Sequence, residues 1–401
     1  MKTIILLGDG MADYPLEELG GRTPLEAANT PNLDRLASSG KLGMARTIKP
    51  GFPPGSDVAN MSVLGLDPGT YYSGRAPIEA VSIGVKLGKD DTAFRINLVT
   101  LTPYENGLVM EDYCSGHIST SEAGELIEAL KPTLMRNPGI GVYRGVEYRH
   151  LMVIHRFDNK DLKTTPPHDI IGERIDPFLP NDALLKGMIF ASMEVLKDHP
   201  VNMARRKLGK RAASAVWPWG EGKGLRVPTL KEEFGLTGAM ISAVDLLKGL
   251  GKLRGMEVIN VPGATGWIDT NYAGKAQAAL DALAKLDMVY IHIEAPDEAG
   301  HGGLVKEKIK AIEDIDEKVL GFILARLEAK SSPFRILCMP DHPTPIVKRT
   351  HTSEPVPFLL FDSTQQANHV RRFTEKDASA TGLFIAEGHT LLQKVLRGEN
   401  L

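Results

Sequence analysis

Short, continuous apolar runs recur along the chain, and each ends in a polar turn. The first run covers residues 4–7 and is followed by Gly8-Asp9-Gly10. Comparable runs lie at residues 288–293, 335–339 and 356–361. A continuous apolar run of this length is typical of a strand that is buried on both faces of its sheet. The pattern therefore predicts four strands of one core sheet.

Helical patterns separate the late strands. Residues 273–286 and 306–327 are long enough for helices. In the second segment apolar residues recur at spacings of three and four, which is the repeat of one helix face: Ile309, Ile312, Ile315, Val319, Phe322 and Ile323. Alternating strands and helices predict an α/β fold, with a mainly parallel sheet that carries helices on both faces.

The middle of the chain has a different texture. Strand-like pieces at residues 95–100 and 150–154 are separated by proline-rich turns and long polar connections. The glycine-rich segment 217–224 is predicted to be a surface loop. We interpret the middle as a smaller α/β domain inserted into the first, so the expected domains are a core of residues 1–86 and 262–401 and an insertion of residues 87–261.

Composition is that of an ordinary globular chain. The 401 residues include 47 Lys and Arg against 50 Asp and Glu, a net charge of −3, and 42% are hydrophobic. These values exclude fibrous, collagen-like and disordered classes.

Two cysteines, Cys114 and Cys338, cannot form a disulfide framework or a thiolate zinc site by themselves. The first apolar run is too short for a signal peptide or a membrane span. We expect a cytoplasmic protein without a membrane partner.

Acids and histidines follow the predicted strands. Asp297 and His301 are four residues apart after one strand, and Asp341 is followed by His342 after the next. In an open α/β sheet, residues beyond the carboxyl ends of the strands meet at one edge. The candidate ligands of a metal centre at that edge are three acids and three histidines: Asp9, Asp297, His301, Asp341, His342 and His351.

Each of these residues also has an ordinary structural explanation, since aspartate favours turns and a lone histidine is usually a hydrogen-bonded structural residue. Turn chemistry alone does not explain the repeated pairing of acid and histidine at successive strand ends. Six oxygen and nitrogen ligands exceed the need of one ion, so we expect two divalent cations. Mn²⁺ is the preferred metal, with Zn²⁺, Mg²⁺ and Co²⁺ as alternatives.

Ser56 is the candidate nucleophile. It follows Pro53-Pro54-Gly55, where a rigid turn is expected to lead into a helix. Backbone N–H groups at a helix N-terminus favour an alkoxide or a phosphate. The alternative is a purely structural N-cap. Ser62 is a weaker candidate, because it lies deeper in the same helix with its hydroxyl expected to face a backbone carbonyl.

A set of motifs extends over nearly the whole chain. They are Gly8-Asp9-Gly10, Thr23-Pro-Leu-Glu-Ala-Ala-Asn-Thr-Pro-Asn32, Gly55-Ser-Asp-Val-Ala-Asn60, Gly74-Arg-Ala-Pro-Ile-Glu-Ala80, Asp297-Glu-Ala-Gly-His301, Pro340-Asp-His342 and His351. In these motifs the sequence resembles the archaeal-type cofactor-independent phosphoglycerate mutases of the alkaline phosphatase superfamily.

The resemblance implies a role for each candidate ligand. Asp9, Ser56, Asp341 and His342 would hold one metal ion, and Asp297, His301 and His351 would hold the other. Ser56 would take the phosphoryl group of 3-phosphoglycerate and return it to the other hydroxyl of the glycerate, without 2,3-bisphosphoglycerate. The inserted domain would exclude water from this reaction.

Substrate contacts are expected from cations, mainly in the insertion, because arginine binds carboxylate and phosphate in a bidentate manner. A solvated surface charge is the alternative explanation for each. Lys248 is expected to occupy the place of a substrate-contacting lysine in the family. The candidates are Arg75, His117, Arg144, Arg149, His168, Asp169, Arg205 and Lys248.

Three other functions compete. The segments at residues 74–77, 166–169 and 217–219 resemble a bacterial branch of the group for which a homoserine kinase activity has been proposed. A metal-dependent phosphatase on the same core would differ only in letting water attack the phosphoserine. A nucleic-acid-binding role for the basic residues 205–207 and 210–211 is disfavoured by the near-neutral net charge and the lack of interleaved aromatic residues.

Overall fold

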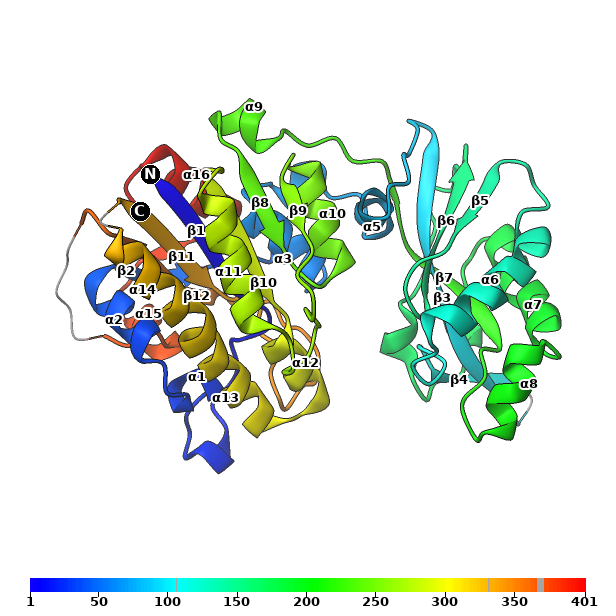
Figure 1. The fold of residues 1–401 in the computed structure, drawn as a ribbon. Coiled ribbons are helices and arrows are strands. Elements are labelled where there is room, and N and C mark those ends of the chain that lie inside the picture. Colours follow the sequence, from blue (N-terminus) through cyan, green and yellow to red (C-terminus); the bar gives the residue numbers. More distant parts are fainter. Residues whose placement is uncertain (106, 331, 366–370) are drawn as a thin grey trace. The chain divides into compact units, whose positions relative to one another are not determined.

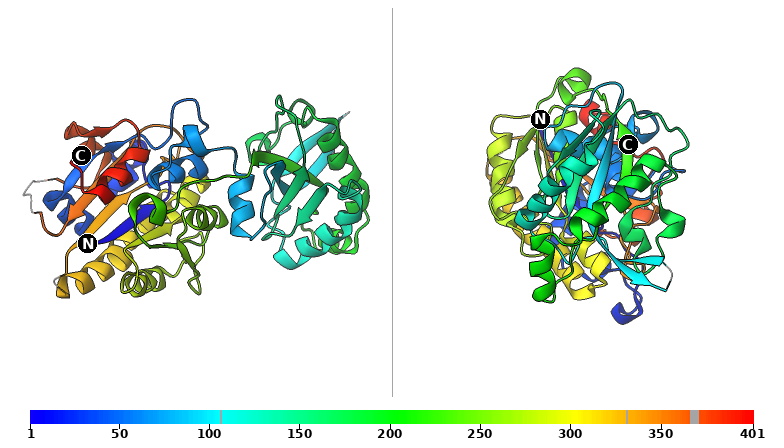
Figure 2. Two further views of the ribbon diagram at one scale, coloured as in Figure 1. Left: turned by 90° about the horizontal axis from the view of Figure 1, so that it is seen from above. Right: turned by 90° about the vertical axis from the view of Figure 1, so that its right-hand side faces the viewer.

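The computed structural model describes residues 1–105, 107–330, 332–365 and 371–401. The chain forms two compact units. Unit 1 comprises Met1–Tyr72 and Arg226–Leu401, and unit 2 comprises Ser73–Leu225. Both chain termini belong to unit 1 (Figure 2).

Unit 1 contains an eight-stranded sheet in the order β13-β2-β12-β11-β1-β10-β8-β9 (Figure 1). Neighbouring strands are parallel except at β12, which is antiparallel to both β11 and β2. This arrangement confirms the predicted α/β fold with a mainly parallel sheet. The strands are β1 (Lys2–Gly8), β2 (Lys41–Ala45), β8 (Gly238–Ile241), β9 (Glu257–Ile259), β10 (Met288–Ile293), β11 (Phe334–Met339), β12 (Val356–Asp362) and β13 (Phe384–Ile385).

Helices connect these strands. Those before the insertion are η1 (Glu17–Leu19), α1 (Pro24–Ala27), α2 (Pro31–Ser39), α3 (Ser56–Val63) and α4 (Pro68–Tyr71). Those after it are α9 (Leu230–Phe234), α10 (Asp245–Leu253), α11 (Tyr272–Leu283), α12 (Ala295–Gly302), α13 (Val305–Asp314), the π-helix η4 (Ile315–Gly321), α14 (Phe322–Ala329), α15 (Glu375–Ala380) and α16 (His389–Arg397).

Both faces of the sheet are buried. On one face Ile4 and its register partner Val289 pack in a core with residues of α11, α13 and α14. Figure 1 shows these three helices along that face of the sheet. On the other face Ile5 lies beside Tyr290, whose hydroxyl reaches Asn60 of α3. Because successive side chains of a strand point to opposite faces, a strand in this position needs mostly apolar side chains on both faces. That requirement explains the continuous apolar runs of the sequence.

The expected domain boundaries differ from those of the two units. The segment after residue 225 contains β8, which pairs with β10 of the large sheet, so it belongs to unit 1. At the other boundary α5 (Ala76–Ser82) belongs to unit 2. Ala76 and Ala80 of this helix pack against Ala93 and Leu151. The insertion therefore begins and ends earlier than the expected range of 87–261.

Unit 2 is built on an antiparallel sheet. Its strands are β3 (Asp91–Tyr104), β4 (Gly107–Asp112), β5 (Ile140–Tyr143), β6 (Arg149–His155) and β7 (Ala215–Lys223). Strand β3 pairs with β4, β6 and β7, and β6 pairs with β5. Its remaining elements are α5, α6 (Thr120–Leu134), η2 (Pro167–Ile170), η3 (Asp176–Phe178), α7 (Ala183–Leu196) and α8 (Pro200–Lys207).

One sequence-based prediction of local structure was wrong. Most of segment 217–224 is not a surface loop but lies in β7, where Trp217 is fully buried. The apolar bulk of its tryptophans outweighs the turn preference of its glycines. The segment 306–327 is helical as predicted, with the π-helix η4 between α13 and α14. In η4 Asp316 accepts the backbone N–H groups of Asn32 and Leu33. Among the described residues, no helix has the length and apolar character needed to span a bilayer.

Candidate metal centre

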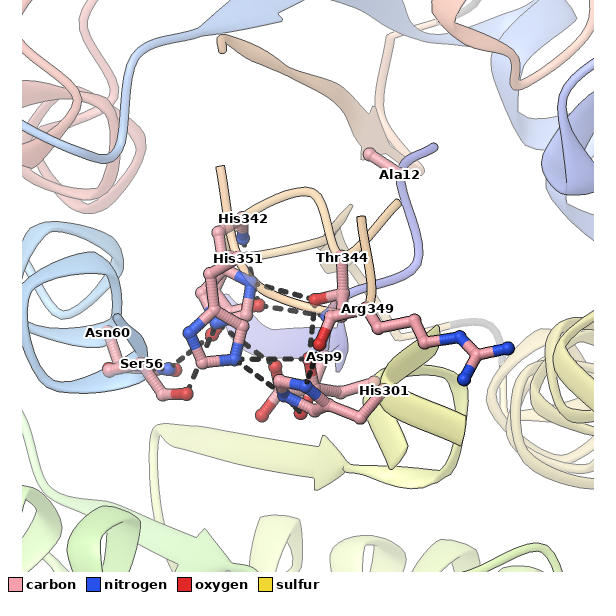
Figure 3. Close-up of polar contacts among 12 residues, drawn as sticks. Asp9, Ala12, Ser56, Asn60, His301, His342, Thr344, Arg349 and His351 are labelled. Atoms are coloured by element: carbon pink, nitrogen blue, oxygen red, sulfur yellow. Dashed lines mark hydrogen bonds and ion pairs between the residues drawn. The ribbon is translucent and has the colours of Figure 1, made fainter. Parts of the chain in front are cut away.

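Three adjacent parallel strands bring the candidate ligands of unit 1 together. Asp9 follows β1, Asp341 and His342 follow β11, and α12 after β10 carries Asp297 and His301. His351 approaches from the connection before β12, and Ser56 is the first residue of α3. Figure 3 shows the side chains it labels among them, those of Asp9, Ser56, His301, His342 and His351, converging on one region. The structure therefore brings together all seven residues that the sequence singled out in the core.

One group of ligand atoms consists of Asp297, His301 and His351. Asp297 Oδ2 lies 3.3 Å from His301 Nε2, and Asp297 Oδ1 lies 3.4 Å from His351 Nε2. The two Nε2 atoms are 2.9 Å apart. One ligand atom from each residue lies within 4.8 Å of the others, a spacing at which they could hold one metal ion. Asp297 and His301 are one helical turn apart, so both side chains lie on the same face of α12.

The outward nitrogen of His301 fixes the orientation of its ring. His301 Nδ1 lies 3.0 Å from the carbonyl oxygen of Arg349, an acceptor that requires an N–H donor. Nε2, the nitrogen that faces Asp297, can then offer its lone pair to a cation. A backbone acceptor behind a histidine is a common support for a metal ligand.

A second group consists of Asp9, Asp297 and His342, whose ligand atoms also lie within 4.8 Å of one another. His342 Nε2 is 3.5 Å from Asp9 Oδ1 and 3.4 Å from Asp341 Oδ2. Asp341 is fully buried, and its Oδ1 accepts the backbone N–H groups of Gly10 and His342. Asp297 is thus near both groups, although the family resemblance assigned it to one ion.

The hydroxyl of Ser56 points at the second group. Gly55 is the N-cap of α3, and Ser56 makes no capping hydrogen bond there. Its Oγ instead lies 3.2 Å from His342 Nε2 (Figure 3). The purely structural explanation of Ser56 as an N-cap is therefore wrong. Ser62, the weaker candidate, donates its hydroxyl to the carbonyl oxygen of Thr47 as expected.

Electrostatics in the centre are dominated by burial and by crowding of carboxylates. Burial, with Asp341 and Asp297 nearby, raises the pKa of Asp9 well above its usual range. Burial also tends to raise the pKa of Asp297, but the imidazoles of His351 and His301 hold it well below its usual range. Burial lowers the pKa of His342 to about 4, which favours a neutral imidazole. Neutral imidazoles and clustered carboxylates are the forms that bind cations.

One atom indicates that the centre suits a cation. Asp9 Oδ1 is buried and has no hydrogen-bond partner among the described residues. A buried carboxylate oxygen without a partner is costly in free energy unless a positive charge compensates it. The donors around it are carboxylate oxygens and imidazole nitrogens, a set that suits Mn²⁺ and Zn²⁺. The residues present therefore fit a divalent metal.

Four further residues of unit 1 contact the centre and escaped the sequence analysis. His292 Nε2 lies 2.8 Å from Asp9 Oδ2, and Thr344 Oγ1 lies 2.5 Å from Asp297 Oδ1. The others are Asn60 and Tyr290, which reach Asp341 as a hydrogen-bonded pair. Asn60 is the last residue of the Gly55–Asn60 motif, and its position there does not indicate a contact with Asp341. Tyr290 and His292 lie inside an apolar run. Two polar residues at alternate positions of a buried strand indicate a polar contact on one face of the sheet, and this pattern could have identified them.

The substrate-binding candidates of unit 2 fall into separate groups. Arg75 pairs with Glu79 at 2.9 Å, and His168 packs edge-on against Trp219, 5.2 Å between ring centroids. The guanidinium of Arg75 lies 6.0 Å from the same Trp219 ring. Arg149 lies 4.3 Å from the Tyr148 ring. Asp169 is beside His168, at 3.7 Å.

The other candidates have different surroundings. His117 and Arg205 line one cavity of about 540 Å³ in unit 2. Arg205 is buried there and donates to the carbonyl oxygen of Ser115 at 2.6 Å and to Glu122 at 2.9 Å, so it braces the loop before α6. Arg144 lies over α6, where Gly124 leaves room for it. Lys248 belongs to unit 1, in α10, 3.8 Å from Asp245.

Comparison with known proteins gives the family. A family model for 2,3-bisphosphoglycerate-independent phosphoglycerate mutase matches residues 37–202. A probable 2,3-bisphosphoglycerate-independent phosphoglycerate mutase of Geobacter sulfurreducens is 51% identical over 400 residues, which cover 99% of this chain and 100% of the relative. The chain belongs to this family of mutases. A Methanosarcina acetivorans mutase of the same name is 53% identical over 90% of each chain.

Solved structures agree with the assignment to the mutase family. A Pyrococcus horikoshii protein has a TM-score of 0.81 at 31% identity, over 100% of this chain and 98% of the other. A cofactor-independent phosphoglycerate mutase from Thermoplasma acidophilum has a TM-score of 0.63 at 28% identity over 100% of both chains. The resemblance stated from the sequence motifs is thereby confirmed.

Proposed function

We propose that the protein interconverts 3-phosphoglycerate and 2-phosphoglycerate without 2,3-bisphosphoglycerate. The observation that carries the proposal is the Ser56 hydroxyl at the first residue of α3, 3.2 Å from His342 and beside the clustered carboxylates and imidazoles. Membership of the mutase family over the full chain supports the same reaction. The substrate is a glycolytic intermediate, which implies a cytoplasmic location for the reaction.

We propose two divalent cations, with Mn²⁺ preferred, as the cofactors. Asp9, Ser56, Asp341 and His342 would hold one, and Asp297, His301 and His351 would hold the other. When bound, the cations would neutralise phosphoryl oxygens and lower the pKa of the Ser56 hydroxyl. The partnerless Oδ1 atom of Asp9 and the facing Nε2 atoms of His301 and His351 support this assignment.

Ser56 would act as the nucleophile in both directions. Its Oγ forms a bond to phosphorus while the bond from phosphorus to O3 of the glycerate breaks, which leaves a phosphoserine and bound glycerate. The glycerate then reorients, and its O2 attacks the same phosphorus and releases Ser56. No phosphoryl group enters from a cofactor, so 2,3-bisphosphoglycerate is not required.

Cations of unit 2 would bind the anionic substrate. Arg75, Arg95 and Arg149 all act on one carboxylate, Glu79, whose pKa they lower against the effect of burial. Arg149 also pairs with Glu147 at 3.3 Å, so three guanidinium groups stand beside two carboxylates and a local excess of positive charge remains. Burial, reinforced by Arg75 and Arg149, lowers the pKa of Arg95 to about 10. A bound anion would offset the excess positive charge of these guanidinium groups. This supports Arg75 and Arg149 as substrate-binding residues.

An enolase-coupled assay tests the proposed function. Purified protein is loaded with Mn²⁺ and supplied with 3-phosphoglycerate in the absence of 2,3-bisphosphoglycerate. We expect turnover that EDTA abolishes and Mn²⁺ restores. Release of inorganic phosphate instead of 2-phosphoglycerate, or turnover only with ATP and homoserine, would overturn the proposal.

A further inference from the structure

Strand β10 carries two buried polar side chains on one face of the core sheet. Tyr290 and His292 are both fully buried, whereas Val289 and Ile291 between and beside them belong to the apolar core of the opposite face. Side chains two residues apart in a strand point the same way. Tyr290 and His292 therefore reach the side of the sheet on which α3 lies. Polar groups buried this deeply require hydrogen-bond partners.

His292 connects Ser242 to Asp9. Its Nε2 lies 2.8 Å from Asp9 Oδ2, and its Nδ1 lies 3.1 Å from Ser242 Oγ. Ser242 Oγ already accepts the backbone N–H of Val244, so its hydroxyl proton is available for Nδ1. The imidazole then donates Nε2–H to Asp9. This contact occupies one oxygen of the carboxylate and leaves the other, Oδ1, directed at the metal centre.

Tyr290 connects to Asp341 through Asn60. The phenol donates to Asn60 Oδ1 at 2.5 Å, which fixes the orientation of the amide. The amide nitrogen then donates to Asp341 Oδ2 at 2.7 Å and to the backbone oxygen of Ser56 at 2.9 Å. One hydrogen-bonded chain thus runs from β10 to a candidate ligand and to the residue that carries the nucleophile.

We propose that Tyr290 and His292 are positioning residues that orient the carboxylates of Asp341 and Asp9 for one metal ion and thereby set its affinity. The inference rests on the proposed metal centre. Both chains reach carboxylates that the proposed function assigns to the same ion. A partner that holds a ligand in one orientation removes the cost of ordering it when the metal binds.

Titration of the full-length protein with Mn²⁺, after removal of metal with EDTA, tests the inference. Calorimetry gives the dissociation constant without any substrate. Tyr290→Phe removes only the hydroxyl, and we expect the Mn²⁺ dissociation constant to rise about 3- to 10-fold, which corresponds to one hydrogen bond. His292→Leu removes both contacts, and we expect a rise of about 10- to 100-fold.

The chain offers a matched control. Tyr272 of α11 is buried on the opposite face of the sheet, and its hydroxyl has no hydrogen-bond partner within the part of the chain that the structure describes. Tyr272→Phe should leave Mn²⁺ affinity unchanged. His292→Gln retains an amide that can donate to Asp9, and we expect it to restore part of the affinity lost in His292→Leu. If His292→Leu does not fold, His292→Gln measures the partial loss of affinity in its place.

Unchanged Mn²⁺ affinity in folded Tyr290→Phe and His292→Leu, or in Tyr290→Phe alone if His292→Leu does not fold, together with a loss of thermal stability, would overturn the inference. Such a result would make both side chains structural. Failure of the proposed function looks different, because the wild-type protein would then bind Mn²⁺ and lack mutase turnover. The binding comparison among the variants is independent of turnover.

Discussion

His342 Nε2 lies 3.2 Å from Ser56 Oγ, although the two residues are 286 positions apart in the sequence. His342 is fully buried in the turn that follows β11, and Ser56 is the first residue of α3. The contact aligns the hydroxyl with the acids and imidazoles at the carboxyl ends of three strands. Ser56 does not act as the N-cap of α3, because Gly55 occupies that position.

Ser56→Ala should lower mutase turnover at least about 1,000-fold, because the only proposed nucleophile is lost. Metal content should remain close to that of the wild type, since the other proposed ligands are present. Ser62→Ala is the matched control in the same helix, and it should retain turnover because the Ser62 hydroxyl donates to the Thr47 carbonyl and not to a residue of the centre. Wild-type turnover in Ser56→Ala would refute the assignment.

His301→Ala should lower metal occupancy and turnover together. Its imidazole faces Asp297 and His351, so its loss should weaken binding by more than the roughly 10- to 100-fold that follows loss of a supporting residue. Elemental analysis after dialysis measures the occupancy. His155→Ala, which changes a half-exposed histidine of unit 2, should change neither quantity. Full occupancy and activity in His301→Ala would contradict the prediction.

Sequence patterns predicted the fold and the centre where one local signal was sufficient. Continuous apolar runs identify β1, β10, β11 and β12, because strands buried on both faces cannot tolerate frequent polar residues. Acids and histidines at the ends of such strands are visible by position alone. Ser56 was identifiable because a proline-glycine turn precedes it.

Contacts between distant segments were not predictable in this way. His292 and Tyr290 interrupt an apolar run, and only the register of β1 and β10 shows that His292 reaches Asp9. The late boundary expected for the insertion differs from the end of unit 2 for a similar reason, since β8 joins the large sheet by pairing with β10. Pairing of this kind leaves no mark in the local sequence.

Lys308→Met should destabilise the protein by about 3–5 kcal/mol, because it leaves a buried carboxylate without its partner. Lys308 is fully buried and donates to Asp13 at 2.7 Å and to the Thr344 carbonyl at 2.8 Å. Urea denaturation measures the change. Lys310→Met in the same helix is the control. Lys310 is half-exposed, and its buried partner Asp314 keeps a second cation, Lys318, at 3.1 Å, so this variant should lose less than about 1 kcal/mol. Equal effects of the two variants would contradict the prediction.

Glu375 should make folding stability dependent on pH. Burial raises its pKa to about 7 from an ordinary value of 4.5. The folded state therefore binds more protons than the unfolded state between these values, and stability attributable to this group falls as pH rises through that interval. Glu375→Gln should gain stability relative to the wild type from pH 4.5 to 7 and then level off. A difference that is constant with pH, measured by denaturant unfolding, would show that the group is not perturbed.

Detection of the phosphoryl group on Ser56 is the most direct test of the proposed reaction. The Mn²⁺-loaded protein is mixed with 3-phosphoglycerate, quenched in acid within one turnover, and digested for mass spectrometry. The proposed mechanism predicts a phosphorylated peptide containing Ser56 that forms and decays at the rate of turnover. Mutase turnover with this peptide unmodified at every quench time would contradict it.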